Sequence, residues 1–316
     1  MSWQPAASQQ MLRKRAGLLA RVRDYFRREE VLEVETPIMS RYGNPDPAIN
    51  SFRTDSDQHP EQYPEQYLHT SPEFPMKRLL ASRSGSIYQI CKVFREEETG
   101  RYHNPEFTML EWYRIGFDHY QLMDDVEAMI IELLPNLMAF ERHTFQTLFK
   151  NHVGLDPLEA TLEELSAKAE SLGVVLPEQV ERDWLLDVLF DLSVGDWLKQ
   201  SGGVFVYNYP ASMASLAQIS PQDSRVAERF ELYIDGIELA NGFHELQDAA
   251  EQKTRFEKDL ASREAQGMDQ PPIDQDFLDA LAVGLPDCSG VALGLDRLLM
   301  LQTGAEHIKE VIAFPG

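Results

Sequence analysis

Cysteine is scarce in this chain, and its scarcity limits the kinds of protein the chain can be. Only Cys91 and Cys288 occur among the 316 residues, and they do not form a C-x-x-C pair. A disulfide framework needs more cysteines, so the pattern favours two reduced core thiols in a reducing compartment such as the cytoplasm. The first residues also lack a basic segment followed by an apolar one, so we expect no secretory signal.

Basic residues are few as well. The chain has 29 Lys and Arg against 52 Asp and Glu, a net charge of −23. Such a charge repels a polyphosphate backbone, which disfavours nonspecific nucleic-acid binding and binding of tRNA. The longest uncharged stretch, 201–222, is interrupted by Asn208, Pro210 and Gln218, whereas a spanning helix needs about 20 mainly apolar residues. We therefore expect no membrane association.

The common nucleotide-binding and hydrolytic motifs are missing. No G-x-G-x-x-G follows a strand pattern, and neither G-x-x-x-x-G-K-[ST], H-E-x-x-H nor G-x-S-x-G occurs. If the protein handles a nucleotide, it must do so with side chains rather than with a glycine-rich phosphate loop.

The hydrophobic spacing predicts helices alternating with long hairpins. A helix is expected over 8–30, a short strand over 31–34, a helix ending near 82, and a hairpin formed by 87–97 and 106–115. Segment 118–200 reads as a mainly helical insertion, with a capping box at Thr161 and a buried stripe made of Leu185, Leu186, Leu189, Leu192 and Leu198.

Strand character returns over 203–209 and 226–234. Asp235-Gly236 is a strong signal for a tight turn into the next strand. Helices over 249–266 and 274–281, a strand over 289–294 and a helix over 296–303 complete the chain. We predict an α+β fold with a mainly antiparallel sheet flanked by helices, forming a single domain over residues 1–316.

The first hairpin gathers residue types that suit ATP. Side chains alternate along a strand, so Arg95 and Glu97 are expected on one face, while Phe107, Met109, Glu111 and Tyr113 share a face of the partner strand. An arginine, a carboxylate and an aromatic ring can hold a phosphate, accept from an amino group and stack on a base. The alternative is an Arg95–glutamate pair on a solvated face.

The second hairpin places two carboxylates near each other. A two-residue turn at 235–236 makes Glu231 the diagonal neighbour of Glu238, at roughly 7 Å. Two such carboxylates repel unless a cation lies between them, and Mg²⁺ carried by a triphosphate fits that need; two solvent-facing glutamates are the alternative. Glu245 could hold a substrate amine or lie in a surface turn. Arg297 follows a glycine-containing strand that lets an anionic ligand approach closely.

Together these segments resemble the signature motifs of class II aminoacyl-tRNA synthetases, in particular the lysyl-type catalytic core. Thr36-Pro37 ends the first motif. The second runs from Phe94-Arg95-Glu96-Glu97 through His103-Asn104-Pro105-Glu106-Phe107, and Gly294-Leu295-Asp296-Arg297 forms the third. The resemblance covers nearly the whole chain, and three motifs in order are far more specific than any one arginine.

The resemblance implies a role for each matching position. Arg95 and Arg297 would be catalytic, acting on the phosphates and the base. Ser71, Pro72 and Glu73 would bind the substrate amino group, and Tyr113 and Glu245 the distal ammonium. Glu231 and Glu238 would hold Mg²⁺. The ATP contacts would be Arg95, Glu96, Glu97, Asn104, Phe107, Glu238, Leu239, Gly294 and Arg297. The implied reaction converts an amino acid and ATP into an aminoacyl adenylate and pyrophosphate.

Two departures from the synthetase pattern redirect the expected acceptor. The catalytic helix begins near residue 8, which leaves no room for an anticodon-binding domain, and Gly290-Val291-Ala292 stands where the synthetases usually have glycine-leucine-glycine. Both departures resemble a stand-alone lysyl-synthetase paralog. That resemblance implies activation of (R)-β-lysine, its transfer to a lysine ε-amino group of elongation factor P, and a homodimer formed near Pro37.

Two other interpretations stay open. The chain could be a truncated synthetase that charges tRNA or a small molecule with lysine. It could also be an inactive paralog that acts as a scaffold, although Arg95, Glu231, Glu238 and Arg297 are all present in register.

Overall fold

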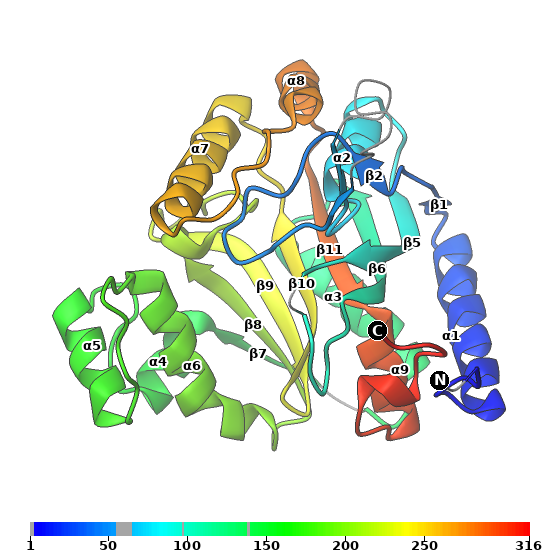
Figure 1. Ribbon diagram of the computed structural model, residues 1–316, viewed down its shortest axis with the longest axis horizontal. Helices are drawn as coiled ribbons and strands as arrows, with labels where there is room; N and C mark the ends of the chain where they lie inside the picture. The colour runs from blue at the N-terminus through cyan, green and yellow to red at the C-terminus, as the bar shows by residue number, and fades with distance from the viewer. Residues whose placement is uncertain (1–2, 55–64, 97, 138–139) are drawn as a thin grey trace. The chain divides into compact units, whose positions relative to one another are not determined.

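The computed structural model describes residues 3–54, 65–96, 98–137 and 140–316 (Figure 1). The chain divides into two compact units. Unit 1 comprises 1–117, 132–134 and 247–316, and unit 2 comprises 118–131 and 135–246. The fold class is α+β with mostly antiparallel strands, as predicted. Two compact units can belong to one domain, so the prediction of a single domain stays a prediction.

Unit 1 is built on the predicted first hairpin. Strands β5 (Ile87–Phe94) and β6 (Glu106–Ile115) are antiparallel, β11 (Cys288–Gly294) pairs antiparallel with β6, and β1 (Leu32–Glu33) runs parallel to β5. A smaller sheet has the order β2 (Met39–Ser40), β4 (Gln66–Leu68), β3 (Arg53–Thr54). Both cysteines are free, as expected.

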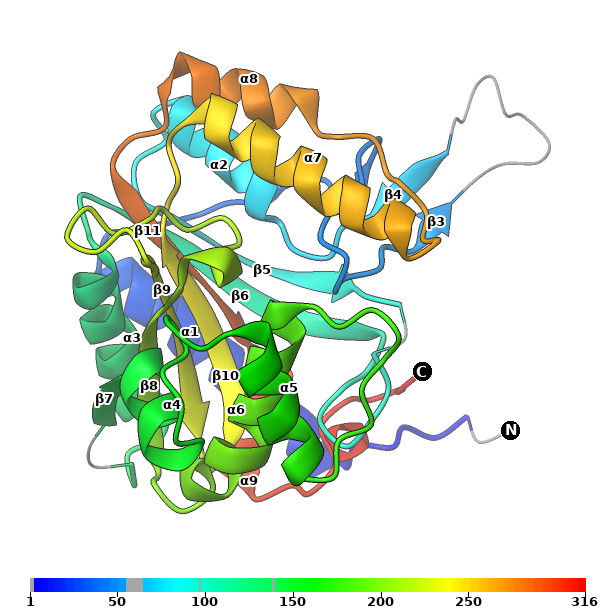
Figure 2. The same cartoon turned by 90° about the vertical axis from the view of Figure 1, so that its left-hand side faces the viewer.

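Aromatic contacts join helix α1 to the sheet of unit 1 and join three other helices to one another. Phe26 of α1 (Gln9–Arg28) stacks on Tyr88 with ring centroids 4.3 Å apart. Phe74 of α2 (Glu73–Ala81) stacks on Phe277 of α8 (Gln275–Gly284), and Phe256 of α7 (Ala249–Ala265) packs beside both, so these three helices lie together in both ribbon views (Figure 2). The unit ends with α9 (Leu295–Thr303) and η2 (Ile308–Glu310).

The described part of unit 2 contains strands β7 to β10 and the predicted helical insertion. β7 (Phe140–Thr144) runs parallel to β8 (Gly203–Pro210), and β8, β9 (Val226–Ile234) and β10 (Ile237–His244) pair antiparallel. The helices are α3 (His119–Leu133), whose last residues belong to unit 1, then α4 (Phe145–His152), α5 (Leu162–Ser171), α6 (Arg182–Leu198) and η1 (Ala211–Met213).

Local turn and cap chemistry was predicted correctly. Asp235 and Gly236 both have positive φ, +51° and +76°, as a two-residue hairpin turn requires. Thr161 and Glu164 form the expected capping box. These features depend on a few adjacent residues, which is why sequence reveals them.

Three details differ from the sequence-based expectations. Leu192 is 55% exposed, because the buried face of α6 turns toward Phe190 and Val194. β7 lies inside the segment expected to be helical, and its pairing partner β8 lies far along the chain. β5 ends at Phe94, so Arg95 follows the strand instead of belonging to it. Glu97, which the alternation argument paired with Arg95, lies outside the described residues.

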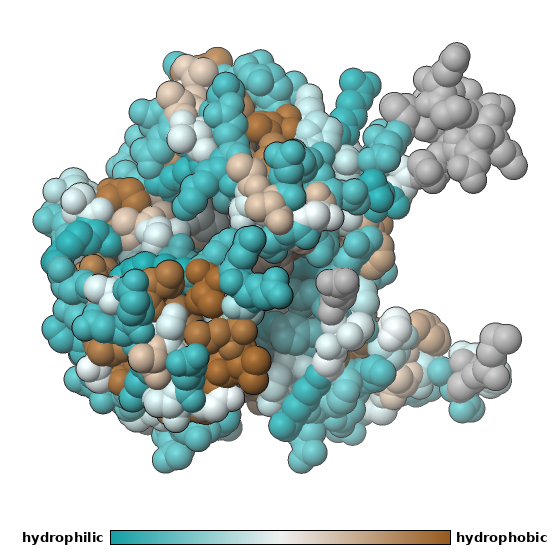
Figure 3. Space-filling view, turned by 60° about the vertical axis from the view of Figure 1, so that its left-hand side comes forward, coloured by the Kyte–Doolittle hydropathy of each residue, from teal (hydrophilic) through white to brown (hydrophobic). Residues whose placement is uncertain are grey.

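Hydrophilic residues occupy most of the face seen in Figure 3, in keeping with the high charge content. Among the described helices, each is too short or too polar to cross a bilayer.

Candidate active site

Alternate residues of β11 have small side chains or none, which leaves space above one face of the unit 1 sheet. Gly290, Ala292 and Gly294 lie opposite Tyr113, Glu111 and Met109 of β6. Directly opposed residues of paired strands share a face, so a small side chain or none stands beside Glu111 and Tyr113. This arrangement lets a ligand approach the backbone closely.

Glu111 is a buried carboxyl group held by neutral donors. It is 2% exposed, and its two oxygens accept hydrogen bonds from Ser71 Oγ and Tyr113 Oη, each at 2.6 Å. Burial, with the nearby Glu73 adding to it, raises the pKa of Glu111 to about 8. The ammonium group of Lys77, which pairs with Glu73, offsets this rise only in part, so an ammonium group of a ligand would be a favourable further neighbour of Glu111.

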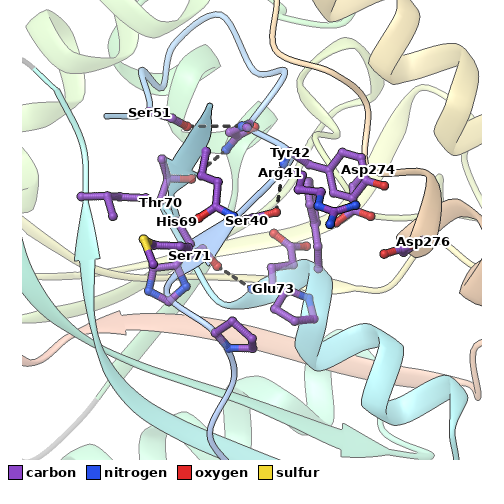
Figure 4. A pocket seen from close by; sticks show the side chains of 18 of the residues that line it. Ser40, Arg41, Tyr42, Ser51, His69, Thr70, Ser71, Glu73, Asp274 and Asp276 are labelled. Carbon is purple, nitrogen blue, oxygen red and sulfur yellow. Dashed lines mark hydrogen bonds between the residues drawn. The ribbon is translucent and has the colours of Figure 1, made fainter. Parts of the chain in front are cut away.

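Residues 71–73 enter α2 beside Glu111. Ser71 Oγ also accepts from the Glu73 backbone N–H at 3.0 Å, and Pro72 is the N-cap residue. Glu73 pairs with Lys77 at 2.6 Å, and the Lys77 side chain is almost fully buried. Ser71 and Glu73 line a cavity of about 380 Å³ together with His69 and Thr70 (Figure 4).

Arg95 contacts both the segment before Ser71 and the aromatic ring of Phe107. Its Nε donates to the carbonyl oxygen of Thr70 at 3.3 Å, one residue before Ser71, and its guanidinium carbon lies 5.2 Å from the centroid of the Phe107 ring. The backbone N–H of Arg95 donates to Pro105 at 3.0 Å, which keeps it beside β6 although β5 has ended. A cation above an aromatic ring can bind a phosphate while the ring stacks on a base.

A short chain of contacts brings the two predicted catalytic arginines into one region. Arg95 Nη1 lies 3.6 Å from Glu98 Oε1, Glu98 Oε2 lies 3.5 Å from His103 Nε2, and His103 Nε2 contacts Arg297 Nη2 at 2.7 Å. Burial and the adjacent Arg297 lower the pKa of His103. Neutral His103 can therefore accept from Arg297. Glu98 was missed at the sequence level, because nothing in its local pattern signals this contact.

The remaining predicted ATP contacts of unit 1 lie around these arginines. Asn104 is buried, donates to the Glu106 carbonyl at 2.7 Å and accepts from the Gly316 N–H at 3.1 Å. Gly294 precedes α9, where a Cβ atom would meet the Arg297 side chain at 3.7 Å. Glu96 is exposed, and its backbone N–H donates to Asn50 at 2.9 Å.

Unit 2 holds the predicted carboxylates Glu231, Glu238 and Glu245. The turn register is as predicted, with Glu238 opposite Tyr233, but a bulge between Glu238 and Ala240 displaces Leu239 from the ladder. Glu231 and Glu238 share a face, and both raise the pKa of Tyr233 in addition to its burial. Glu245 is 2% exposed and forms an isolated bridge with Ala217.

The magnesium prediction can be checked against the donors around each carboxylate. Glu231 Oε2 accepts from Tyr209 Oη at 2.7 Å and from Tyr233 Oη at 2.6 Å, while Oε1 pairs with Arg229. Glu231 thus retains little capacity for an ion, and the Arg229 cation repels one. Glu238 is half-buried, and its carboxylate is an oxygen ligand of the kind that Mg²⁺ prefers.

Comparisons with known proteins identify the family of this chain. The family model of the class II tRNA synthetases (D, K and N) matches residues 1–316, so the chain belongs to this family. Curated relatives are named elongation factor P–(R)-β-lysine ligase. The Vibrio parahaemolyticus protein is 50% identical over 99% of this chain and 98% of its own length. Those of Vibrio cholerae and Salmonella paratyphi B are each 51% identical over 99% of this chain and 97% of their own.

Proposed function

We propose that this chain is a ligase that uses ATP to activate (R)-β-lysine and transfers it to a lysine ε-amino group of elongation factor P. The observation that carries the proposal is the Glu111 cluster: a buried carboxyl group with a raised pKa, joined through residues 70–71 to Arg95. This arrangement suits a substrate that has an ammonium group at one end and reacts with a phosphate at the other. The names of the curated relatives support the substrate and the acceptor.

In the first step, a carboxylate oxygen of the amino acid attacks the α-phosphorus of ATP. An O–P bond forms, the bond to the β-phosphate bridge breaks, and pyrophosphate leaves with the electron pair. Arg95 is positioned to neutralise the α-phosphate while Phe107 stacks beneath adenine and Arg297 covers it. The phosphate must replace Glu98 as the partner of Arg95, and a bidentate contact at close range is stronger than the 3.6 Å pair.

In the second step, an unprotonated lysine amine of the acceptor attacks the adenylate carbonyl. A C–N bond forms, the mixed anhydride breaks, AMP leaves, and the amine gives up one proton. Positioning and charge neutralisation dominate both steps, so no side chain is required as a general base.

The protein groups around the amino acid have distinct proposed roles. Ser71, Pro72 and Glu73 place its amino group, Tyr113 and Glu245 bind the distal ammonium, and Glu111 supplies a second carboxylate to the substrate. Ala292 stands directly opposite Glu111, so its methyl group is placed to shape the substrate end.

The remaining ATP contacts keep their predicted roles as proposals. These contacts are Glu96, Glu97, Asn104, Leu239 and Gly294. When Mg²⁺ is bound it would neutralise the triphosphate, with Glu238 as the principal carboxylate and Glu231 as the weaker candidate. The homodimer near Pro37, the cytoplasmic location and the absence of tRNA binding stay predictions.

The direct test is the mass of purified elongation factor P after incubation with this protein and ATP. Separate reactions contain (R)-β-lysine, α-lysine or no amino acid, and parallel reactions offer tRNA as the acceptor. We expect one added lysyl group on elongation factor P, with (R)-β-lysine preferred. Charging of tRNA instead would favour the truncated synthetase, and no pyrophosphate exchange with either isomer would favour the scaffold.

A further inference from the structure

Unit 2 contains a cluster of metal-ligating residue types on the sheet face opposite Glu231 and Glu238. The cluster comprises Glu228 of β9, His244 at the end of β10, and His119 at the start of α3. Phe243 pairs with Arg229, so His244 continues the register opposite Glu228. Successive residues of a strand point to opposite faces, which separates Glu228 from Glu231.

The three side chains converge closely. One candidate ligand atom from each lies within 4.8 Å of the other two. Glu228 Oε2 is 2.6 Å from His244 Nδ1 and 3.9 Å from His119 Nδ1. All three side chains line a cavity of about 530 Å³, whose walls include Gln218 and Asn208.

A hydrogen-bond network explains only part of this cluster. Gln218 Nε2 donates to Glu228 Oε2 at 3.0 Å, and His244 bonds to the same oxygen. His119 is different: it is 2% exposed, and its ring nitrogens form no hydrogen bond of normal geometry in the part of the chain that the structure describes, although the Asn208 side chain and the Glu228 carboxylate lie near. A buried polar group without a hydrogen bond of normal geometry costs free energy and calls for an explanation.

We propose that His119, Glu228 and His244 bind one divalent transition-metal ion, with Zn²⁺ as the representative ion. Two imidazole nitrogens and one carboxylate oxygen form a known zinc ligand set, with bonds of about 2.0–2.2 Å and a fourth position for water. Nitrogen ligands disfavour Mg²⁺ and Ca²⁺, which prefer oxygen. The ion would take the place of the proton between His244 and Glu228, and it would give the buried His119 ring a ligand bond in place of its poorly oriented neighbours.

The electrostatics of the cluster favour cation binding. Glu228 supplies a carboxylate oxygen, and the two imidazole rings supply nitrogen lone pairs, within one small region. One negative charge and two neutral rings would leave a Zn²⁺ complex with a net charge of +1.

The ion would join three segments that are distant in sequence. It would tie the first turn of α3 to β9 and to the last residue of β10, immediately before Glu245. Its expected role is therefore to fix the local backbone, and its binding can be tested independently of the proposed ligase activity.

The test measures Zn²⁺ binding to the full-length protein after treatment with a chelator. Titration calorimetry and metal analysis after gel filtration are applied to the wild type, His119→Asn, His244→Asn and the control His143→Asn, which changes a histidine outside the cluster that pairs with Glu141. We expect one tightly bound Zn²⁺ per chain in the wild type and the control. Each cluster variant should bind at least about tenfold more weakly, since even indirect changes at metal sites cost that much.

Cobalt spectroscopy tests the wild type alone, so its result does not depend on whether the variants fold. Co²⁺ added to the wild type should produce the visible absorption of a four-coordinate ion, and one equivalent of Zn²⁺ should remove it. The proposal is overturned if the wild type retains less than stoichiometric Zn²⁺, if its Co²⁺ form lacks that absorption, or if folded His119→Asn binds as tightly as the control.

Discussion

Two buried glutamates, Glu111 in unit 1 and Glu231 in unit 2, have similar neutral surroundings but different charge partners. Glu111 accepts from Ser71 and Tyr113, each at 2.6 Å. Glu231 accepts from Tyr209 and Tyr233 at 2.7 and 2.6 Å and pairs in addition with Arg229. Hydroxyl donors are thus common to both sites, and the guanidinium is present at only one.

We expect this difference in charge partners to distinguish a carboxylate that binds a ligand from one that mainly supports the fold. A buried carboxylate with an arginine partner already has its charge balanced by the protein. A buried carboxyl group without such a partner has a raised pKa, as Glu111 does at about 8, and it gains most from a cation that arrives with a ligand. The contrast predicts that Glu231 supports the fold and that Glu111 supports substrate binding.

The largest expected effect is on stability, in Glu231→Gln. Removing the charge takes the ion-pair partner from the largely buried Arg229, although Asp187 remains nearby, so the free energy of unfolding should fall by about 3 kcal/mol. Chemical denaturation followed by circular dichroism measures this value. Glu238→Gln is the matched comparison, because the half-buried Glu238 should be nearly neutral for stability while adenylate formation is lost. If the two variants were equally stable, the proposed role of Glu231 in supporting the fold would be wrong.

The second largest expected effect is on the rate of adenylate formation, and it tests the proposed contact of Arg95 with the α-phosphate. Arg95→Lys keeps a positive charge but loses the planar, bidentate contact, so we expect adenylate formation to slow by about 10²- to 10³-fold. Pyrophosphate exchange measures the rate. Arg101→Lys, an exposed residue of the same loop that donates to the Glu306 carbonyl, is the control and should retain activity. A normal rate for Arg95→Lys would exclude the proposed contact with the α-phosphate.

The third expected effect is on the KM for the amino acid, and it tests whether Glu111 binds the substrate ammonium. Glu111→Gln is nearly isosteric and resembles the protonated form of the free protein, so the fold should persist. Loss of a charged hydrogen-bond acceptor should raise the KM for (R)-β-lysine about 10- to 100-fold, with a smaller effect on the KM for ATP. Glu106→Gln, an exposed residue of the same strand, is the control. An unchanged KM for the amino acid would place its ammonium elsewhere.

The smallest effect is on selectivity. Ala292 faces Glu111 across the strand pair, so Ala292→Gly should shift preference toward α-lysine by less than about tenfold, since one methyl group contributes about 1 kcal/mol. Competition between the two isomers in a single exchange reaction measures the ratio. An unchanged ratio would show that this methyl group does not contact the substrate.

Local signals accounted for much of what the sequence predicted. The turn at Asp235-Gly236, the capping box at Thr161 and the hairpin of β5 and β6 depend on neighbouring residues and appear as expected. The three ordered motifs gave the family, which the full-length match supports. Features that depend on pairing between distant segments could not be predicted from the sequence, because no local pattern encodes them. Strand β7 and the bulge after Glu238 are examples.

The site, too, was predictable only where it depends on residues close together in sequence. Sequence alternation placed Glu111 and Tyr113 on one face, which the pairing of β6 confirms. It could not show that Ser71 bonds to Glu111, or that Arg229 balances Glu231, since burial and charge pairing arise from tertiary contacts. The predicted roles of the individual site residues stay predictions until binding is measured.

The central claim is that Glu111 is neutral in the free protein and ionises when a cationic amino acid binds. Titration calorimetry of (R)-β-lysine near pH 7, in buffers of different ionisation enthalpy, counts the protons exchanged. A pKa of about 8 makes the free carboxyl group mostly protonated, and an adjacent ammonium lowers that pKa, so the wild type should release close to one proton per ligand. Glu106→Gln should release the same number and Glu111→Gln almost none. Equal proton release from Glu111→Gln and the wild type, or none from either, would contradict the account.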